Sequence, residues 1–250
     1  MDQNYLLGHW YAYIYDQKVI QDDVQHILST VGEAPRNILE VACGSGRIAI
    51  PLARAGHTVT GFDIDAFMLA RIPEKAAGLP NLTYYQADAL ADDWGKGFDV
   101  VVLSGNVLVN IITDGDYRQA QELFIRKAAA CVKPGGHLYL DFDCVNWEDD
   151  QPEQERERVF FERTDDLGTY GRYIGMSGGG YDSRTRVDLG RRRYEITPLG
   201  GEPLRIIRDM HKYFPVYEEV ISWLTKYGWE IEWHSPVSTE TFHAIIWARK

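Results

Sequence analysis

The segment from Asn37 to Asp65 constrains the fold of this chain more than any other. It reads NILEVACGSGRIAIPLARAGHTVTGFDID: an apolar strand, a glycine-rich turn, a short amphipathic helix and a second strand that ends in an acid. Gly44 and Gly46 allow the turn to bring its backbone close to a ligand, and Gly56 suits the position just past a helix end. This layout is half of a nucleotide-binding strand-helix-strand unit.

Strands and helices continue to alternate after this segment. Apolar runs at 81–88 and 98–103 predict two more strands, and the second, FDVVVL, has the uniformly apolar character of a strand covered on both faces. A helix is predicted over 116–132 with Asp116 as its N-cap. KPGG then predicts a tight turn into a fifth strand, HLYLDFD.

The end of the chain returns to the same pattern. A helix is predicted near 216–227, and WEIEWHSPV and TFHAIIWARK predict two further strands. The fold class that follows is α/β, a doubly wound, Rossmann-like sheet of seven mostly parallel strands whose last strand is antiparallel.

Two regions depart from this rhythm. Between 145 and 214, short alternating runs separated by DDLG, GGG, DLG and LGGE predict an inserted antiparallel meander of about four strands. Residues 1–36 are rich in aromatic side chains and include a predicted helix near 22–31. The expected domains are an N-terminal aromatic and helical lid (1–36), a nucleotide-binding domain (37–144 with 215–250) and an inserted β lid (145–214).

Composition excludes several classes of function. The net charge of −11 leaves no excess of Lys and Arg to displace counterions from nucleic acid, so we expect no nucleic acid partner. The three cysteines, Cys43, Cys131 and Cys144, are odd in number and lack metal-ligand spacing, which predicts a reduced cytoplasmic protein without a disulfide or metal site. No leader pattern or 18-residue apolar segment occurs, so no membrane association is expected.

The glycine turn alone suits two classes of ligand. The run from Gly44 to Ala49 satisfies the G-x-G-x-x-G/A pattern of dinucleotide sites, and Asp63 lies at a spacing that suits a ribose. On these residues an NAD(P)-dependent oxidoreductase remains an alternative.

The rest of the chain favours a different family. EVACGSGR followed by GFDID resembles motif I and the acidic loop of class I S-adenosylmethionine-dependent methyltransferases. The likeness extends to FDVVVL, KPGG and the terminal helix with its two strands. The insertion, followed by DMHKYFPVYEEVISWLTKYGW, resembles the glycine and amino-sugar N-methyltransferase group. One departure is Ala42, which stands where the family has its usual first glycine.

The resemblance implies a binding site for S-adenosylmethionine on the first two strands. Glu40 would lie beneath the methionine moiety, while Ala42, Gly44 and Gly46 would let the backbone approach it. Asp63 would accept hydrogen bonds from both ribose hydroxyls through its two carboxylate oxygens.

Six further residues are implied for the adenine and the reactive methyl group. They are Ile64 and Met68 on the adenine faces, Asp88 and Ala89 at the adenine edge, and Leu103 and Ser104 beside the methyl group.

Catalysis requires an acceptor lone pair in line with the sulfur–methyl bond, and a protonated acceptor requires a base. Tyr11 and Tyr15, which match the tyrosine-rich N-terminal lid of the amino-sugar group, and His211 are the candidates. Tyr11 and Tyr15 are also expected to cover the cofactor.

The expected function is methyl transfer to a nitrogen, or to an oxygen, of a small-molecule acceptor, by a monomer or homodimer. A non-catalytic S-adenosylmethionine-binding protein is a further alternative.

Overall fold

The computed structural model describes residues 3–17, 22–144, 156–235 and 243–250. The chain divides into two compact units. We call Ile20–Asn146 with Phe214–Lys250 the α/β unit, and Met1–Val19 with Trp147–Tyr213 the antiparallel unit. The N-terminal region that was predicted as one lid is therefore shared between both units.

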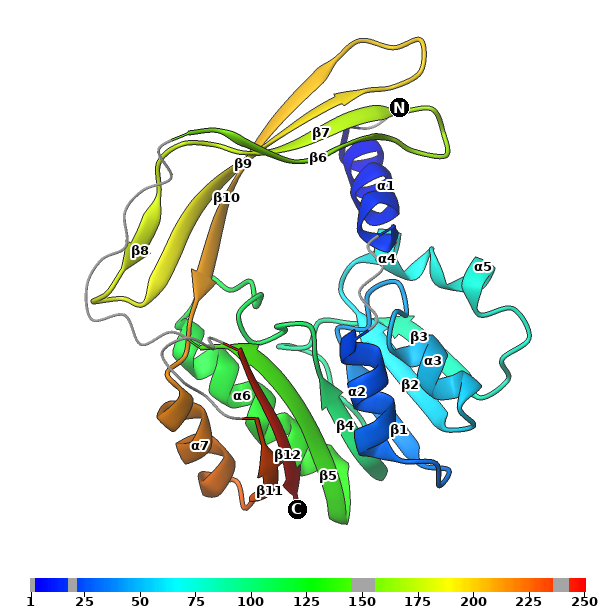
Figure 1. Ribbon diagram of the computed structural model, residues 1–250, viewed down its shortest axis with the longest axis vertical. Coiled ribbons are helices and arrows are strands. Elements are labelled where there is room, and N and C mark those ends of the chain that lie inside the picture. Colours follow the sequence, from blue (N-terminus) through cyan, green and yellow to red (C-terminus); the bar gives the residue numbers. More distant parts are fainter. Residues whose placement is uncertain (1–2, 18–21, 145–155, 236–242) are drawn as a thin grey trace. The chain divides into compact units, whose positions relative to one another are not determined.

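The α/β unit is built on a seven-stranded sheet of order β11-β12-β5-β4-β1-β2-β3 (Figure 1). Its strands are β1 (Asn37–Val41), β2 (Thr58–Asp63), β3 (Leu82–Gln86), β4 (Phe98–Leu103), β5 (Val132–Asp143), β11 (Glu230–His234) and β12 (His243–Arg249). β12 runs antiparallel to β5 and to β11, while the pairs among β1 to β5 are parallel. The predicted fold class, including the antiparallel last strand, is confirmed.

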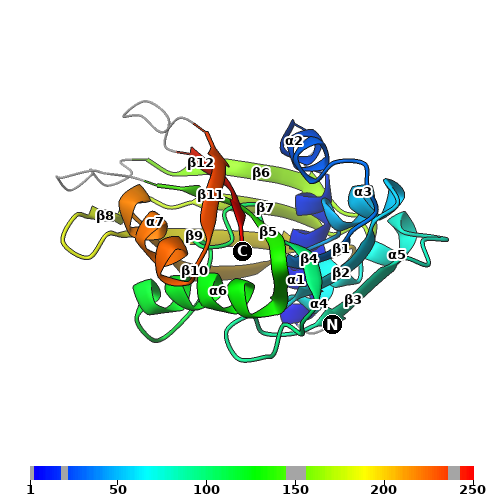
Figure 2. The same cartoon turned by 90° about the horizontal axis from the view of Figure 1, so that it is seen from below.

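Helices cover both faces of this sheet (Figure 2). They are α2 (Asp22–Val31), α3 (Ala49–Arg54), α4 (Ala66–Leu69), α5 (Ile72–Lys75), α6 (Tyr117–Cys131) and α7 (Tyr217–Lys226). Adjacent residues of β1 point into different cores, because side chains alternate along a strand. Leu39 packs in the cluster that holds Phe124 of α6 and Trp223 of α7, and Ile38 packs in the cluster that holds Leu52 of α3.

Local signals place these elements close to their predicted positions. Asp116 is the N-cap of α6, as expected, and its side chain accepts a hydrogen bond from the Gln119 amide. The predicted tight turn at KPGG is wrong, because these residues belong to β5, which begins directly after α6. The pairing of β5 with β4 shifts register between Phe98 and Val100, and this irregularity accommodates the proline and glycines.

The antiparallel unit contains a five-stranded sheet in place of the four strands expected. Its strands are β6 (Arg158–Thr164), β7 (Tyr170–Gly175), β8 (Gly180–Asp182), β9 (Val187–Thr197) and β10 (Leu204–Tyr213). The order is β10-β9-β7-β6, and β8 pairs with β9 (Figure 1). The additional strand is β8, only three residues long, which starts in the glycine run that was predicted to separate strands.

The aromatic N-terminus is helix α1 (Gln3–Asp16), which packs on the antiparallel sheet. Trp10 is fully buried, and its indole nitrogen donates a 3.0 Å hydrogen bond to the carbonyl of Arg163. The ring lies directly on Gly171, where an added Cβ atom would stand 2.2 Å from the indole. Only a glycine leaves room for this contact, so α1 and the antiparallel sheet form one core.

No helix in the described part of the chain is long and apolar enough to cross a membrane.

Candidate functional site

The glycine turn lies at the carboxyl end of β1, where parallel sheets bind ligands. Ala42, Gly44 and Gly46 all have positive φ, at 58°, 55° and 80°. These angles curl the backbone into a cradle, and the Cys43 amide ties it to β2 through a 3.0 Å hydrogen bond to the Phe62 carbonyl. Ala42 thus adopts the left-handed conformation that the usual glycine would adopt, at a cost that β1 and β2 sustain.

Asp63, at the end of β2, fixes the turn and the loop beside it. One carboxylate oxygen accepts from the Gly44 amide at 2.8 Å, and the other accepts from the Asp65 amide at 2.8 Å. Burial raises the pKa of Asp63, although these two backbone hydrogen bonds oppose the shift. Each oxygen retains a further lone pair, so the carboxylate can also bind a ligand.

The loop after Asp63 presents both residues expected beside adenine. Asp65 is the N-cap of α4, and its side chain accepts from the amides of Phe67 and Met68. Ile64 is 62% exposed and Met68 is buried. The loop therefore carries one apolar side chain that faces solvent, together with one that belongs to the core.

Glu40 is the most isolated acid of the α/β unit. Its side chain is 4% exposed, and its Oε2 atom has no hydrogen-bond partner among the described residues. Burial raises its pKa to about 8, against the opposing charge of Arg47. Arg47 itself is paired with Asp23 at 2.6 Å. The carboxyl accepts a backbone hydrogen bond at Ala49, but leaving its buried Oε2 atom without a partner is costly, which is typical of a site that binds a cationic or hydrogen-donating ligand.

The loop after β3 contains Asp88 and Ala89. Asp88 accepts from the Leu90 amide at 2.8 Å. Lys127, from α6, donates to the carbonyls of Ala89, Leu90 and Asp92 at 2.7, 2.9 and 2.7 Å. Because these carbonyls converge on one ammonium group, the loop is held at the carboxyl edge of the sheet.

Leu103 and Ser104 end β4, next to β1 in the sheet. Leu103 is fully buried, and the Ser104 hydroxyl donates to the Asp141 carboxylate of β5. Asp141 and the residues linked to it, Asn106, Asp143 and His243, were not predicted as site residues from the sequence. The signal was present in LDFD, where two acids alternate at the end of an apolar strand.

The structure brings the predicted residues from Glu40 to Ser104 to the carboxyl edge of one sheet, on β1, β2, β3 and β4 and the loops that follow them. Tyr11, Tyr15 and His211 lie in the antiparallel unit. That these three residues share a site with the residues of the α/β unit stays a prediction. The ligand contacts expected of the residues from Glu40 to Ser104 also stay predictions.

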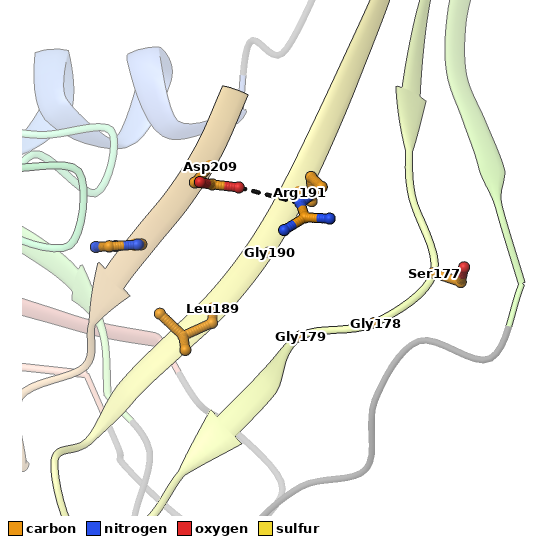
Figure 3. A pocket seen from close by; sticks show the side chains of 8 residues that line it. Ser177, Gly178, Gly179, Leu189, Gly190, Arg191 and Asp209 are labelled. Carbon is orange, nitrogen blue, oxygen red and sulfur yellow. Dashed lines mark hydrogen bonds and ion pairs between the residues drawn. The ribbon is translucent and has the colours of Figure 1, made fainter. Parts of the chain in front are cut away.

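Tyr11 contributes to the core of the antiparallel unit. Its ring meets Tyr173 and Tyr194 edge-on, with centroids 5.8 and 6.0 Å apart. His211 lies on β10 and lines a pocket of about 400 Å³ with the glycine run before β8. Arg191 of β9 and Asp209 of β10, direct partners on adjacent strands, also line this pocket and form a 3.1 Å ion pair (Figure 3).

Comparison with known proteins identifies the α/β unit. Residues 38–136 match the family model described as "Methyltransferase domain". The chain is 32% identical over 115 residues to the ubiquinone biosynthesis O-methyltransferase of Paracidovorax citrulli, and this match covers 44% of each protein. The chain thus spans less than half the length of the curated relatives it matches.

Solved structures extend the likeness to the whole chain. CalS10, an amino pentose methyltransferase from Micromonospora echinaspora whose structure is SAM-bound, is 16% identical with a TM-score of 0.65, over 100% of this chain and 98% of that one. KedS8, a sugar N-methyltransferase from Streptoalloteichus, is 18% identical with a TM-score of 0.67, over 92% and 86%. The predicted resemblance is confirmed: residues 38–136 match a methyltransferase domain, and the chain has the class I methyltransferase fold.

Proposed function

We propose that this chain is an S-adenosylmethionine-dependent methyltransferase that acts on a nitrogen, or an oxygen, of a small-molecule acceptor. The observation that carries the proposal is the buried carboxyl of Glu40, whose Oε2 atom has no partner among the described residues, beneath a glycine turn that Asp63 holds in place. The amino group of a bound methionine moiety would give Glu40 the partner that it lacks. A dinucleotide pyrophosphate would instead place negative charge beside two acids, which disfavours an oxidoreductase.

The other residues at the same edge supply the remaining contacts. Asp63 would hold the ribose hydroxyls, and the exposed side chain of Ile64 and the neighbouring Met68 would offer apolar surface to adenine. Asp88 and Ala89 would bind the adenine edge from the loop that Lys127 holds. Ala42, Gly44 and Gly46 line the turn, and Leu103 and Ser104 end the strand beside it.

The chemistry then depends chiefly on orientation. When bound, S-adenosylmethionine supplies a methyl group on a sulfonium, a good leaving group. The chain must hold the acceptor atom in line with it, exclude water and receive any proton that the acceptor loses. In the proposal, Tyr11 and Tyr15 cover the site, and Tyr11, Tyr15 and His211 are candidates for contact with the acceptor.

The names of the relatives support a small-molecule acceptor that is methylated on either oxygen or nitrogen. The first relatives are named as O-methyltransferases of ubiquinone biosynthesis, and KedS8 is named as a sugar N-methyltransferase. The net charge of −11 argues against a nucleic acid. All three cysteines are buried free thiols, which supports a reducing cytoplasm. In the proposal the chain acts there as a monomer or homodimer.

Thermal and chemical unfolding with S-adenosylhomocysteine or NAD⁺ tests the donor class. A ligand at 100 times its Kd stabilises the folded state by about 2.7 kcal/mol, and we expect this effect from S-adenosylhomocysteine only. Stabilisation by NAD⁺ without any by S-adenosylhomocysteine would contradict the proposal.

A tritiated-methyl transfer screen tests the activity itself. The pool should contain amino sugars, primary amines and phenols. Transfer to any member supports catalysis, whereas binding of S-adenosylhomocysteine without transfer to any member favours a non-catalytic binding protein.

A further inference from the structure

A continuous chain of hydrogen bonds crosses the ends of three strands in the α/β unit. Ser104, after β4, donates to Asp141 of β5. The Asn106 amide donates to the other oxygen of Asp141 at 3.0 Å, and the Asn106 side chain donates to Asp143 at 2.8 Å. Asp143 then pairs with Nδ1 of His243, the first residue of β12, at 2.8 Å.

This hydrogen-bond network is buried at the end near Asp141 and exposed to solvent at the end near His243. Asp141 is 3% exposed, whereas the side chains of Asp143 and His243 are 38% and 47% exposed. A proton or a polar acceptor can therefore reach the imidazole, while the carboxylate of Asp141 is shielded from solvent. His243 and Asp143 are direct cross-strand partners in the ladder between β12 and β5.

Asn106 gives this network a rigidity that a surface pair lacks. Its φ of 62° is left-handed, a conformation that costs an asparagine of order 1 kcal/mol. Its side chain makes two hydrogen bonds to Asp143, because Oδ1 also accepts from the Asp143 amide at 2.5 Å. A strained residue that holds Asp143 through both its carboxylate and its backbone amide is typical of a positioned functional group.

The surroundings of His243 are acidic. Asp143 and Asp141 face it from β5, and Asp23 faces it from α2, where it is paired with Arg47. The hydrogen bond from Asp143 raises the pKa of His243, and burial opposes that shift. Such a site attracts a cationic acceptor in preference to an anionic one.

We propose that His243 accepts the proton of a protonated amine acceptor, and that Asp143 is the positioning residue that orients the imidazole. This inference rests on the proposed function and narrows it to an amine. Asp143 holds Nδ1 as the donor, which leaves Nε2 as the acceptor of the proton.

The step balances in charge and atoms. The ammonium N–H bond breaks, its proton goes to His243 Nε2, and the electron pair remains on nitrogen. That pair forms the new N–C bond to the methyl group as the C–S bond breaks, and the electrons of the C–S bond stay on sulfur as a neutral thioether. His243 then releases the proton to water, so the products are a methylated ammonium and one proton.

The experiment compares His243→Gln and Asp143→Asn with the wild-type chain, and uses His234→Gln as a matched control on the exposed strand β11. Glutamine retains an amide that can still bind Asp143 but cannot accept a proton at neutral pH. The readouts are the pH profile of methyl transfer to the amines of the screening pool, the Kd of S-adenosylhomocysteine, and the NMR titration of the histidine rings.

We expect His243→Gln to lower kcat/KM for the amine about 100-fold at pH 7, in the range typical of a lost general base. The deficit should shrink as the pH approaches about 10, where an amine loses its own proton. The Kd of S-adenosylhomocysteine should stay within twofold, and His234→Gln should match the wild type. In Asp143→Asn, the His243 resonance should titrate at lower pH.

Three results would overturn the inference while the proposed function stands: unchanged transfer in His243→Gln, a deficit that does not vary with pH, or an unshifted His243 titration in Asp143→Asn. Transfer to phenols and to no amine would overturn the amine assignment. If the wild-type chain fails to bind S-adenosylhomocysteine, the proposed function itself is wrong and the inference falls with it.

Discussion

At the scale of single residues, the burial of the Glu40 carboxyl destabilises the folded protein when that carboxyl is ionised. Its pKa of about 8 lies above its value in an unfolded chain, so the folded state holds one more proton between those two pH values. Stability therefore decreases as the pH rises through this window, by up to about 1.4 kcal/mol per pH unit, and levels off above about pH 8. A ligand that pairs with Glu40 recovers part of this cost on binding.

We predict that Glu40→Gln is more stable than the wild type without ligand. The difference in the free energy of unfolding should be small near pH 5, increase toward pH 8 and then remain constant, because glutamine does not ionise. Urea unfolding at several pH values measures it, with the exposed Glu33→Gln as control. A difference that is the same at every pH would show that Glu40 does not titrate in this range.

Asp63 accepts backbone hydrogen bonds that stabilise the fold, and it is also a proposed ligand contact. The substitution Asp63→Asn tests both roles. In Asp63→Asn one of the two oxygens becomes a donor, so either the Gly44 or the Asp65 amide loses its acceptor. We expect a loss of about 1–3 kcal/mol in the free energy of unfolding and at least tenfold weaker binding of S-adenosylhomocysteine. Calorimetry and urea unfolding measure both effects, and the exposed Asp114→Asn should change neither. Unaltered affinity would remove Asp63 from the site.

The sequence indicates such residues when they follow a strand directly. Glu40 and Asp63 stand at the ends of apolar runs, so their place at the carboxyl edge could be predicted. The contact between Asn106 and Asp143 could not, because Asn106 lies in a loop and meets Asp143 only after β4 and β5 pair. Tertiary contacts between distant segments carry no local periodicity.

At the scale of elements, one side chain of α6, Lys127, bridges several carbonyl groups of the loop after β3. The ammonium of Lys127 satisfies three carbonyl groups and lies 5.6 Å from the centroid of the Trp94 ring. Burial lowers its pKa. The helix thus organises a loop whose own short hydrogen bonds, such as that from Leu90 to Asp88, are local.

Lys127→Met tests this support. Methionine keeps an apolar chain of similar length but leaves three carbonyls without their donor, so we expect a loss on the order of 3 kcal/mol. Hydrogen exchange should accelerate over residues 88–94 and remain unchanged in α3. Arg126→Met, at an exposed position on the same helix, is the matched control. Equal exchange in both variants would contradict the assigned role of Lys127.

Elements with strong periodicity were predictable, and short irregular ones were not. FDVVVL and the helix after Asp116 gave clear patterns, and both formed within a residue of the expected bounds. β8 was missed because its three residues start in a glycine run, where only pairing with β9 defines a strand. The proline and glycines of KPGG belong to β5 because a register shift accommodates them, which their turn chemistry does not reveal.

At the scale of the whole molecule, the two units have separate cores. The antiparallel unit depends on the contact between Trp10 and Gly171, which joins α1 to a strand far along the chain. Residues 1–36 could be predicted to contain aromatic and helical segments, but not to contribute to both units. The amphipathic pattern of a helix predicts that one face is buried, but it does not predict which part of the protein packs against that face.

We predict that Gly171→Ala destabilises the antiparallel unit by about 3 kcal/mol, at the upper end of what overpacking costs, because the new methyl group overlaps the indole. Hydrogen exchange should increase in α1 and β7 and stay unchanged in the α/β unit. Gly115→Ala meets only Thr113 at an ordinary distance of 3.4 Å and should be nearly neutral. If Gly171→Ala were equally neutral, Trp10 would not anchor α1.

The anchoring of α1 has a practical consequence for chimaeric enzymes. The boundaries between the units fall at 19–20, 146–147 and 213–214, so an exchange of the antiparallel unit has three crossover points. A graft of Trp147–Tyr213 alone would set a foreign strand against the native Trp10, and most side chains at position 171 would collide with it. The transplantable module is the discontinuous pair of segments, with the first nineteen residues moved together with the sheet.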